Sequence, residues 1–212
     1  MMTTLTEIAR TEMSRLVEGL NEPELRRFFE RNLSDLVDEK ELRNYLTGVM
    51  ADVVLHDKTS IFFDERPTPV MLDDMWKQER AQAFDSFKTT GDVIMWLCGY
   101  FPEAMAKSRR ARLGLREYIK TGKTAYDCAI YLGNVTKRPD VPTISRVSDH
   151  LAQLSGAIFD FRNRMNYAYL ANLNQETEEE IRQVFYKGGE IPLYHERARL
   201  KIISFPRRKG TN

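Results

Sequence analysis

The most regular pattern in this chain of 212 residues is an apolar stripe within residues 38–56. Apolar side chains recur there at steps of three and four, which is the spacing of one face of an α-helix. They are Leu42, Tyr45, Leu46, Val49, Met50, Val53 and Val54. Because the strict alternation of a half-buried strand is absent, the pattern predicts an amphipathic helix.

Helical spacing of the same kind continues through most of the chain. It predicts helices over residues 4–20, 23–36, 72–87, 115–132, 143–170 and 177–187. Thr143 and Thr177 are expected to cap the last two, and residues 57–70 to form the one long loop. Since no two segments look like paired strands, we predict an all-α fold: a single globular multi-helix bundle of about eight helices.

Two segments are expected to lie at the centre of this bundle. Residues 93–98 are apolar on all sides, which indicates a short helix surrounded by protein. Thr89 and Asp92 have the spacing of a capping box that would begin this helix. Residues 115–132 carry small side chains along their stripe, so a neighbouring backbone can approach closely. They predict a second apolar central helix.

The charges divide the chain into a helical body and a basic end. The whole sequence holds 32 basic and 31 acidic side chains, but residues 186–212 hold seven basic ones against two acidic ones. We therefore expect a helical domain over residues 1–190 and a basic C-terminal arm over 191–212. Within the domain, residues 1–37 can form a peripheral helical hairpin.

The residues needed for common catalytic centres do not occur at the required spacing. None of the three histidines, His56, His150 and His195, has the carboxylate three positions earlier that a di-iron bundle requires. Asp52 and His56 are more typical of a solvent-facing pair than of a metal site. The phosphate loop suggested by residues 121–124 fails because position 117 is Glu. We expect no metal, no cofactor and no catalytic residue, and we leave open whether the protein is an enzyme.

The cysteines and the hydropathy point to the cytoplasm. Cys98 and Cys128 both lie in apolar runs, which is typical of reduced core thiols in a cytosolic protein. Charged side chains occur at regular intervals in the first twenty residues, so these do not form a signal peptide. The longest apolar run, 93–98, is far too short to cross a membrane. We expect no association with a membrane.

Four residues are candidates for a small-molecule site between the helices near 92–101 and 115–132. They are Asp92, Trp96, Tyr118 and Tyr126. The two tyrosines flank Gly122 at a distance of four residues, which would form a notch between two phenol rings. Packing of a neighbouring helix into this notch is the competing interpretation, and for Asp92 it is the capping box.

Basic side chains form a second set of candidates, for contact with an anion or a nucleic acid. They are Arg109, Arg110, Arg112, Arg207, Arg208 and Lys209. Local clusters of this kind can attract phosphates even in a chain of nearly neutral net charge. A solvated helix face and a soluble tail are the competing interpretations.

The segment from Gly91 to Leu132 resembles a known group of proteins. Its features are Gly-Asp at 91–92, Phe-Pro-Glu at 101–103, Arg-Arg at 109–110, and then Tyr118, Gly122 and Ala-Tyr at 125–126. They are similar to the central signature of a group of uncharacterised bacterial helical proteins, and the similarity covers about half the chain. This chain has Glu117-Tyr118 where the group tends to have paired tyrosines. The group has no established reaction, so the resemblance implies the fold and not the chemistry.

The leading hypothesis is therefore a cytoplasmic helical protein that acts by binding. We expect it to self-associate through an apolar helix face, as a homo-oligomer, without catalysis. A small-molecule site, enzymatic or sensory, is the first alternative. Weak binding of nucleic acid by the basic segments is the second.

Overall fold

The computed structural model describes residues 19–56, 68–103, 114–165 and 175–186. All regular structure within these ranges is α-helical, which confirms the all-α prediction. The described residues form eight helices: α2 (Glu22–Leu33), α3 (Lys40–His56), α4 (Thr68–Met75), α5 (Arg80–Tyr100), α7 (Leu115–Thr136), α8 (Val141–Asp149), α9 (Leu151–Arg164) and α10 (Gln175–Tyr186).

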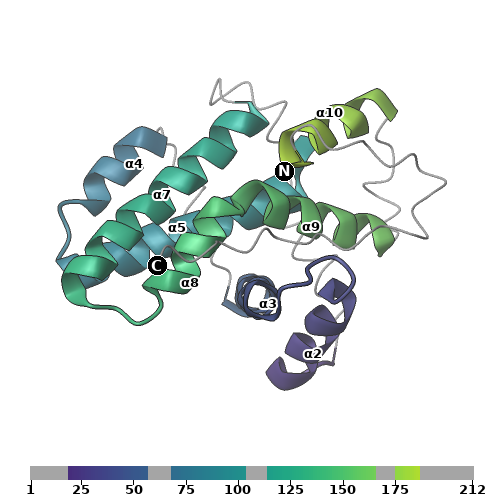
Figure 1. Ribbon diagram of the computed structural model, residues 1–212, viewed down its shortest axis with the longest axis horizontal. Helices are drawn as coiled ribbons and strands as arrows, with labels where there is room; N and C mark the ends of the chain where they lie inside the picture. Colours follow the sequence, from purple (N-terminus) through teal and green to yellow (C-terminus); the bar gives the residue numbers. More distant parts are fainter. Residues whose placement is uncertain (1–18, 57–67, 104–113, 166–174, 187–212) are drawn as a thin grey trace, which may run out of the picture.

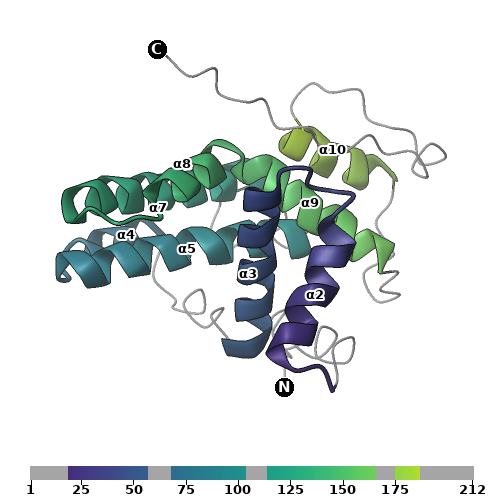
Figure 2. The ribbon, with the colours of Figure 1, turned by 60° about the horizontal axis from the view of Figure 1, so that its bottom comes forward.

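Helix α5 is the central element of the fold, and α7 and α9 pack along it. Helix α4 packs against α5, and in Figure 1 α10 lies over α9 at the opposite end of the molecule from α4. Figure 2 shows that α2 and α3 run together and cross the layer of α5 and α7 at a steep angle. The crossing brings one face of α3 onto the middle of α5.

Helix α5 is continuous for 21 residues, so the predicted helix start at Thr89 is wrong. The next residue, Thr90, satisfies its hydroxyl inside the helix by donating to the carbonyl oxygen of Ser86 at 2.8 Å. Every residue from Thr90 to Phe101 is buried, as expected for a helix surrounded by protein. The continuity places Asp92 in the interior of a helix and not at its end.

The second helix that is buried on nearly all sides is α9, whereas α7 is half exposed. Each residue from Leu154 to Arg162 is buried. Helix α7 buries its small residues, Gly122, Ala125 and Ala129, against neighbouring helices, and its opposite face lies in solvent. The small residues thus do permit close approach, but they belong to a helix that covers the core.

The predicted single helix from Thr143 to Leu170 is wrong, because the chain bends at His150. His150 has φ −112° and ψ 16°, outside the helical range, and it separates α8 from α9. Thr143 lies inside α8, which begins at Val141. The bend lets α8 pack on α7 while α9 packs along α5.

Helix α2 begins with a capping box that was not predicted. The Asn21 side chain accepts from the backbone N–H of Glu24 at 3.1 Å, and the Glu24 carboxylate accepts from the N–H of Asn21 at 3.0 Å. The ring of Phe29 packs edge-on against Phe161 of α9, with centroids 5.7 Å apart. The part of the predicted hairpin that is described, from residue 19 on, is therefore attached to the core; residues 1–18 lie outside the described ranges.

Further boundaries differ from the sequence prediction. The predicted helix over 72–87 is wrong, because α4 ends at Met75 and α5 begins at Arg80. Helix α4 begins at Thr68, inside the segment expected to be a loop, and α10 begins at Gln175, two residues before the expected cap at Thr177. The basic arm over 191–212 lies outside the described residues. No described helix combines the length and the hydropathy that crossing a membrane requires.

Candidate functional site

Asp92 joins three helices through one buried carboxylate, which is 6% exposed. Tyr45 of α3 and Tyr126 of α7 both donate their hydroxyl to Oδ1, at 2.6 and 2.7 Å. Lys88, one turn earlier on α5, donates its ammonium to Oδ2 at 2.8 Å. The Lys88 ammonium also lies 4.9 Å from the centroid of the Tyr45 ring. We call Tyr45, Lys88, Asp92 and Tyr126 the Asp92 cluster.

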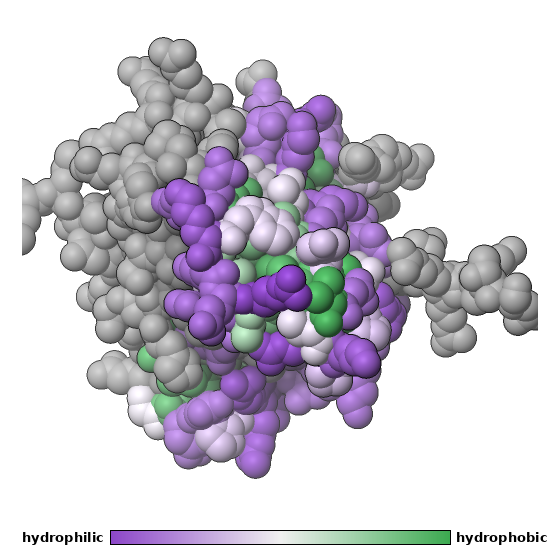
Figure 3. Space-filling model, turned by 90° about the vertical axis from the view of Figure 1, so that its left-hand side faces the viewer, coloured by the Kyte–Doolittle hydropathy of each residue, from purple (hydrophilic) through white to green (hydrophobic). Residues whose placement is uncertain are grey.

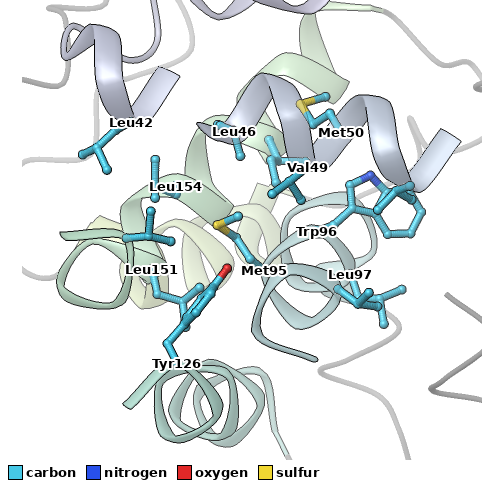
Figure 4. Packing of buried hydrophobic residues seen from close by; sticks show 14 of the residues in the cluster. Leu42, Leu46, Val49, Met50, Met95, Trp96, Leu97, Tyr126, Leu151 and Leu154 are labelled. Atoms are coloured by element: carbon cyan, nitrogen blue, oxygen red, sulfur yellow. The ribbon is translucent and has the colours of Figure 1, made fainter. Parts of the chain in front are cut away.

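Gly91 permits the close approach of α7 on which this cluster depends. A Cβ atom at position 91 would lie 2.8 Å from two carbons of the Tyr126 ring, closer than real Cβ contacts. Figure 4 shows the Tyr126 side chain reaching from α7 toward α5, with Met95 and Leu151 beside it. The Gly-Asp pair therefore has two separate roles: Gly91 accommodates the ring, and Asp92 accepts from its hydroxyl.

Both tyrosines of the Asp92 cluster are held in the neutral form. Burial raises the pKa of Tyr126 well above its ordinary value, and the negative charge of Asp92 raises it further. Burial and Asp92 raise the pKa of Tyr45 in the same direction. Neutral phenols are donors and not bases, so the arrangement is suited to stabilising a buried carboxylate. It supplies neither a phenolate nucleophile nor an unpaired carboxylate.

Trp96, the second candidate ligand residue, packs with other aromatic rings. Its indole stacks on Tyr100, with centroids 5.2 Å apart, and meets the edge of Phe101. Figure 4 shows it near Met50 and Val49 of α3. The indole N–H is buried and has no acceptor among the described residues. Trp96 thus lies within the apolar core and outside the hydrogen bonds of the Asp92 cluster.

Tyr118 and Tyr126 do not share a site. Tyr118 packs against a separate cluster of buried residues that includes Ile94, Phe159 and Phe185. Two helical turns, about 12 Å along α7, separate it from Tyr126. The notch between them at Gly122 is filled, because a Cβ there would lie 2.8 Å from Cγ2 of Ile94 and 3.0 Å from Cδ2 of Leu151. Helix packing, the competing interpretation, describes this position.

A second buried carboxylate, which was not predicted, also accepts hydrogen bonds from a basic side chain and a tyrosine. Asp160 of α9 pairs with Arg182 of α10 at 2.7 Å, and the Tyr186 hydroxyl donates to its other oxygen at 2.8 Å. The Tyr186 ring lies against Gly156, where a Cβ would be 2.6 Å from the ring. Asp160 and Arg182 are each 5% exposed. This Asp160 cluster attaches α10 to α9 as the Asp92 cluster attaches α7 to α5.

The largest exposed apolar side chains gather at one end of the molecule. Five large hydrophobic residues of the described ranges are exposed, and three of them, Trp76, Tyr131 and Val135, lie on the turn after α4 and on α7. The Trp76 and Tyr131 rings are 6.2 Å apart, and Val135 is one helical turn beyond Tyr131. Figure 3 looks onto this end, where pale and green surface is enclosed by hydrophilic side chains. We call these three residues the aromatic patch.

The six basic candidates, Arg109, Arg110, Arg112, Arg207, Arg208 and Lys209, all lie outside the described residues. Among the residues that the structure describes, no three His, Cys, Asp or Glu side chains lie close enough together to hold a metal ion. Asp52, which was considered with His56 as a possible metal ligand, accepts a hydrogen bond from the guanidinium of Arg26 at 3.3 Å.

Sequence reasoning did not find Tyr45, Lys88 or the aromatic patch. Tyr45 counted as one apolar member of the stripe in α3, and its hydroxyl gave no separate signal. Lys88 is four residues before Asp92, the spacing of an ion pair on one helix, but the predicted boundary at Thr89 separated them. Trp76 and Tyr131 are far apart in the chain, so only the fold brings their rings together.

Comparisons with known proteins give no relative for this chain: no protein-family model, no curated protein and no solved structure matches it.

Proposed function

We propose that this protein is a non-catalytic binding protein that acts through the aromatic patch. The main observation behind this proposal is the exposure of Trp76 and Tyr131, 45% and 62%, whose rings meet edge-on in one surface. Trp and Tyr dominate the binding energy of protein interfaces, because each buries a large area with few rotatable bonds. The patch is therefore suited to a protein surface as its partner.

The patch is held in place before any partner arrives. The Trp76 ring packs on the buried ring of Phe87 in α5, with centroids 4.9 Å apart. Tyr131 and Val135 project from the last two turns of a 22-residue helix. A rigid surface loses little conformational entropy when it binds, so more of the contact energy appears as affinity.

The buried clusters support the non-catalytic part of the proposal. The Asp92 carboxylate accepts from two phenols and one ammonium, and all three donors come from the protein itself. Such a network stabilises the crossing of α3, α5 and α7. Cys98 and Cys128 are both free thiols, which supports our further proposal of a reducing location such as the cytoplasm.

Site-specific photocrosslinking tests the proposal. A benzophenone amino acid replaces Tyr131 in the full chain, which is produced in living cells to about 100 μM so that a weak complex is populated, and the cells are irradiated. We expect a discrete crosslinked species. The matched control places the same amino acid at Leu55 on α3, which is 41% exposed and lies outside the patch. Equal crosslinking at both positions, or none at position 131, would refute a binding role for the patch.

Weak binding of a polyanion is a second candidate, favoured by one face of α7. Arg116, Lys120 and Lys123 are exposed and recur at steps of four and three, so they form a basic stripe. Three phosphate contacts predict a salt dependence with a slope of about −2 for single strands. Fluorescence anisotropy with a labelled oligonucleotide at several salt concentrations measures this slope. Binding that the Lys120→Glu variant leaves unchanged would eliminate this candidate.

A further inference from the structure

We infer that the partner of the aromatic patch is a second copy of this chain, related by a two-fold axis that passes close to Tyr131. This inference rests on the proposed function and adds the identity of the partner to it. In a two-fold interface the same surface meets itself, so the surface must be complementary to its own copy. The charges around the patch are of both signs, which such a surface requires.

Charges of both signs lie at the border of the aromatic patch, and two ion pairs show this. Next to Trp76, the ammonium of Lys77 pairs with Asp74 at 2.7 Å. Beyond Val135, Arg138 pairs with Asp85 at 3.3 Å. A border that carries acids and bases side by side can face its own copy with opposite charges opposed, whereas a strongly acidic or basic partner would meet repulsion on part of it.

The net charge of the chain adds little repulsion between two copies. The formal net charge of the chain is +1, so long-range repulsion between identical molecules is small. Tyr131, the most exposed of the large apolar side chains in the described ranges, lies between Trp76 on one side and Val135 on the other. A two-fold axis near this ring lets Tyr131 of each copy contact the aromatic patch of the other.

The small size of the patch predicts a weak and reversible dimer. Together the two rings expose on the order of 200–250 Å², well below the roughly 800 Å² that each partner contributes to a standard interface. The charged border must supply the remaining area. We therefore expect a dissociation constant of about 10–100 μM, which is typical of a transient complex.

Sedimentation equilibrium with charged variants at one position tests the inference. The full chain is measured from about 1 to about 500 μM, as wild type, Tyr131→Glu, Tyr131→Lys and an equimolar mixture of the two variants. We expect the wild type to dimerise and each variant alone to do so at least tenfold more weakly, because two like charges then meet at the axis. The mixture should recover dimers, because the introduced carboxylate of one copy then meets the introduced ammonium of the other.

Each alternative result has a definite meaning. A wild type that stays monomeric, dimers that resist both substitutions, or a mixture that fails to recover would each overturn the inference. Far-UV circular dichroism checks that the variants are folded, and Leu55→Glu controls for the loss of an exposed apolar side chain elsewhere. The crosslinking experiment separates this inference from the proposed function, because an adduct at position 131 with a mass other than that of two chains supports the patch and rejects the second copy.

Discussion

The phenol ring of Tyr126 lies directly against Gly91, in the space that any other side chain at position 91 would enter. The hydroxyl of the same ring donates to Asp92, the next residue of α5. The Tyr126 side chain of α7 thus makes two contacts with α5. Its ring fills the space left by the absent side chain of Gly91, and its hydroxyl bonds to the neighbouring carboxylate of Asp92. This relationship fixes how α7 sits on α5.

Gly91→Ala should destabilise the fold by about 1–3 kcal/mol, because the added methyl group overlaps the Tyr126 ring. Gly48→Ala is the matched control, since it makes the same change within α3 and its Cβ would meet only the end of the Arg26 side chain at 3.5 Å. That variant should gain about 0.5–1 kcal/mol from the helix preference of alanine. Urea unfolding followed by circular dichroism measures both. If the two variants have similar free energies of unfolding, the close contact between the Tyr126 ring and Gly91 is contradicted.

Removing one partner of the ion pair between Asp160 and Arg182 should lower the free energy of unfolding strongly, whereas replacing both partners by apolar residues should lower it less. Arg182→Met leaves the Asp160 carboxylate buried without its counter-charge and should cost about 3–5 kcal/mol. Combining Asp160→Leu, Arg182→Met and Tyr186→Phe removes the buried ion pair and the hydroxyl together, and should cost less than the single change. Glu178, which also accepts from Arg182 at 3.2 Å, remains in both variants, so its loss of a partner is common to the two. Amide exchange in α10 and urea unfolding report the difference. A combined variant less stable than Arg182→Met would be inconsistent with this account.

Alkaline pH should unfold the protein through one buried and two partly buried tyrosines. The pKa values of Tyr45, Tyr126 and Tyr186 are raised in the folded state, mainly by burial, so the folded chain holds these protons more tightly than the unfolded chain. Their contribution to stability is complete below the unfolded pKa of about 10 and is lost as the pH rises above it. Each phenol adds a slope of up to about 1.4 kcal/mol per pH unit.

The Tyr126→Phe variant isolates one of these contributions. Its free energy of unfolding should fall less steeply above about pH 10 than that of the wild type, by the slope of one phenol. Absorbance at the phenolate band, recorded in the same samples, should show these tyrosines ionising only as the protein unfolds. Parallel curves for wild type and variant would exclude the coupling.

The two thiols should differ in reactivity by their burial. Cys98 is fully buried, and burial raises its pKa strongly. Cys128 is partly exposed; partial burial raises its pKa, and the negative charge of Asp127 raises it further. A thiol reagent at neutral pH should therefore modify Cys128 slowly and Cys98 only when the core opens. In a Cys128→Ser variant, the rate at Cys98 should rise with urea as unfolding does; rapid labelling without urea would argue against the buried position.

Apolar spacing was sufficient to predict that the chain is helical, because each stripe records which face is buried. It did not reveal the turn between Met75 and Arg80, which divides the predicted helix over 72–87 into the end of α4 and the start of α5. The helix boundaries depended on local chemistry and failed where tertiary contacts decide. Thr89 and Asp92 have the spacing of a cap, yet α5 passes through them because Tyr126 packs on Gly91 and Asp92 receives donors from two other helices. His150 shows the opposite case: an unbroken apolar stripe conceals a bend that the packing of α8 and α9 requires.

The candidate site was predicted in part for the same reason. Asp92 and Tyr126 are hydrogen-bonded to each other, as their grouping in one site predicted. Both lie in apolar helices, where a buried carboxylate and a buried phenol need hydrogen-bond partners and few polar groups are available. Trp96 and Tyr118 were grouped with them by distance along the chain, but the direction in which each side chain leaves its helix places them in other surroundings. A single sequence does not contain these directions.

The shared contact of Gly91, Asp92 and Tyr126 also limits how the sequence can change over evolutionary time. A larger residue at position 91 is compatible with the fold only if a smaller side chain replaces the ring at position 126. A smaller side chain at position 126, in turn, lacks the hydroxyl that donates to Asp92. No single replacement at these positions is neutral, so tolerated changes must occur together. In any set of descendants of this chain, the three positions should covary, with position 45 as the fourth member of the group.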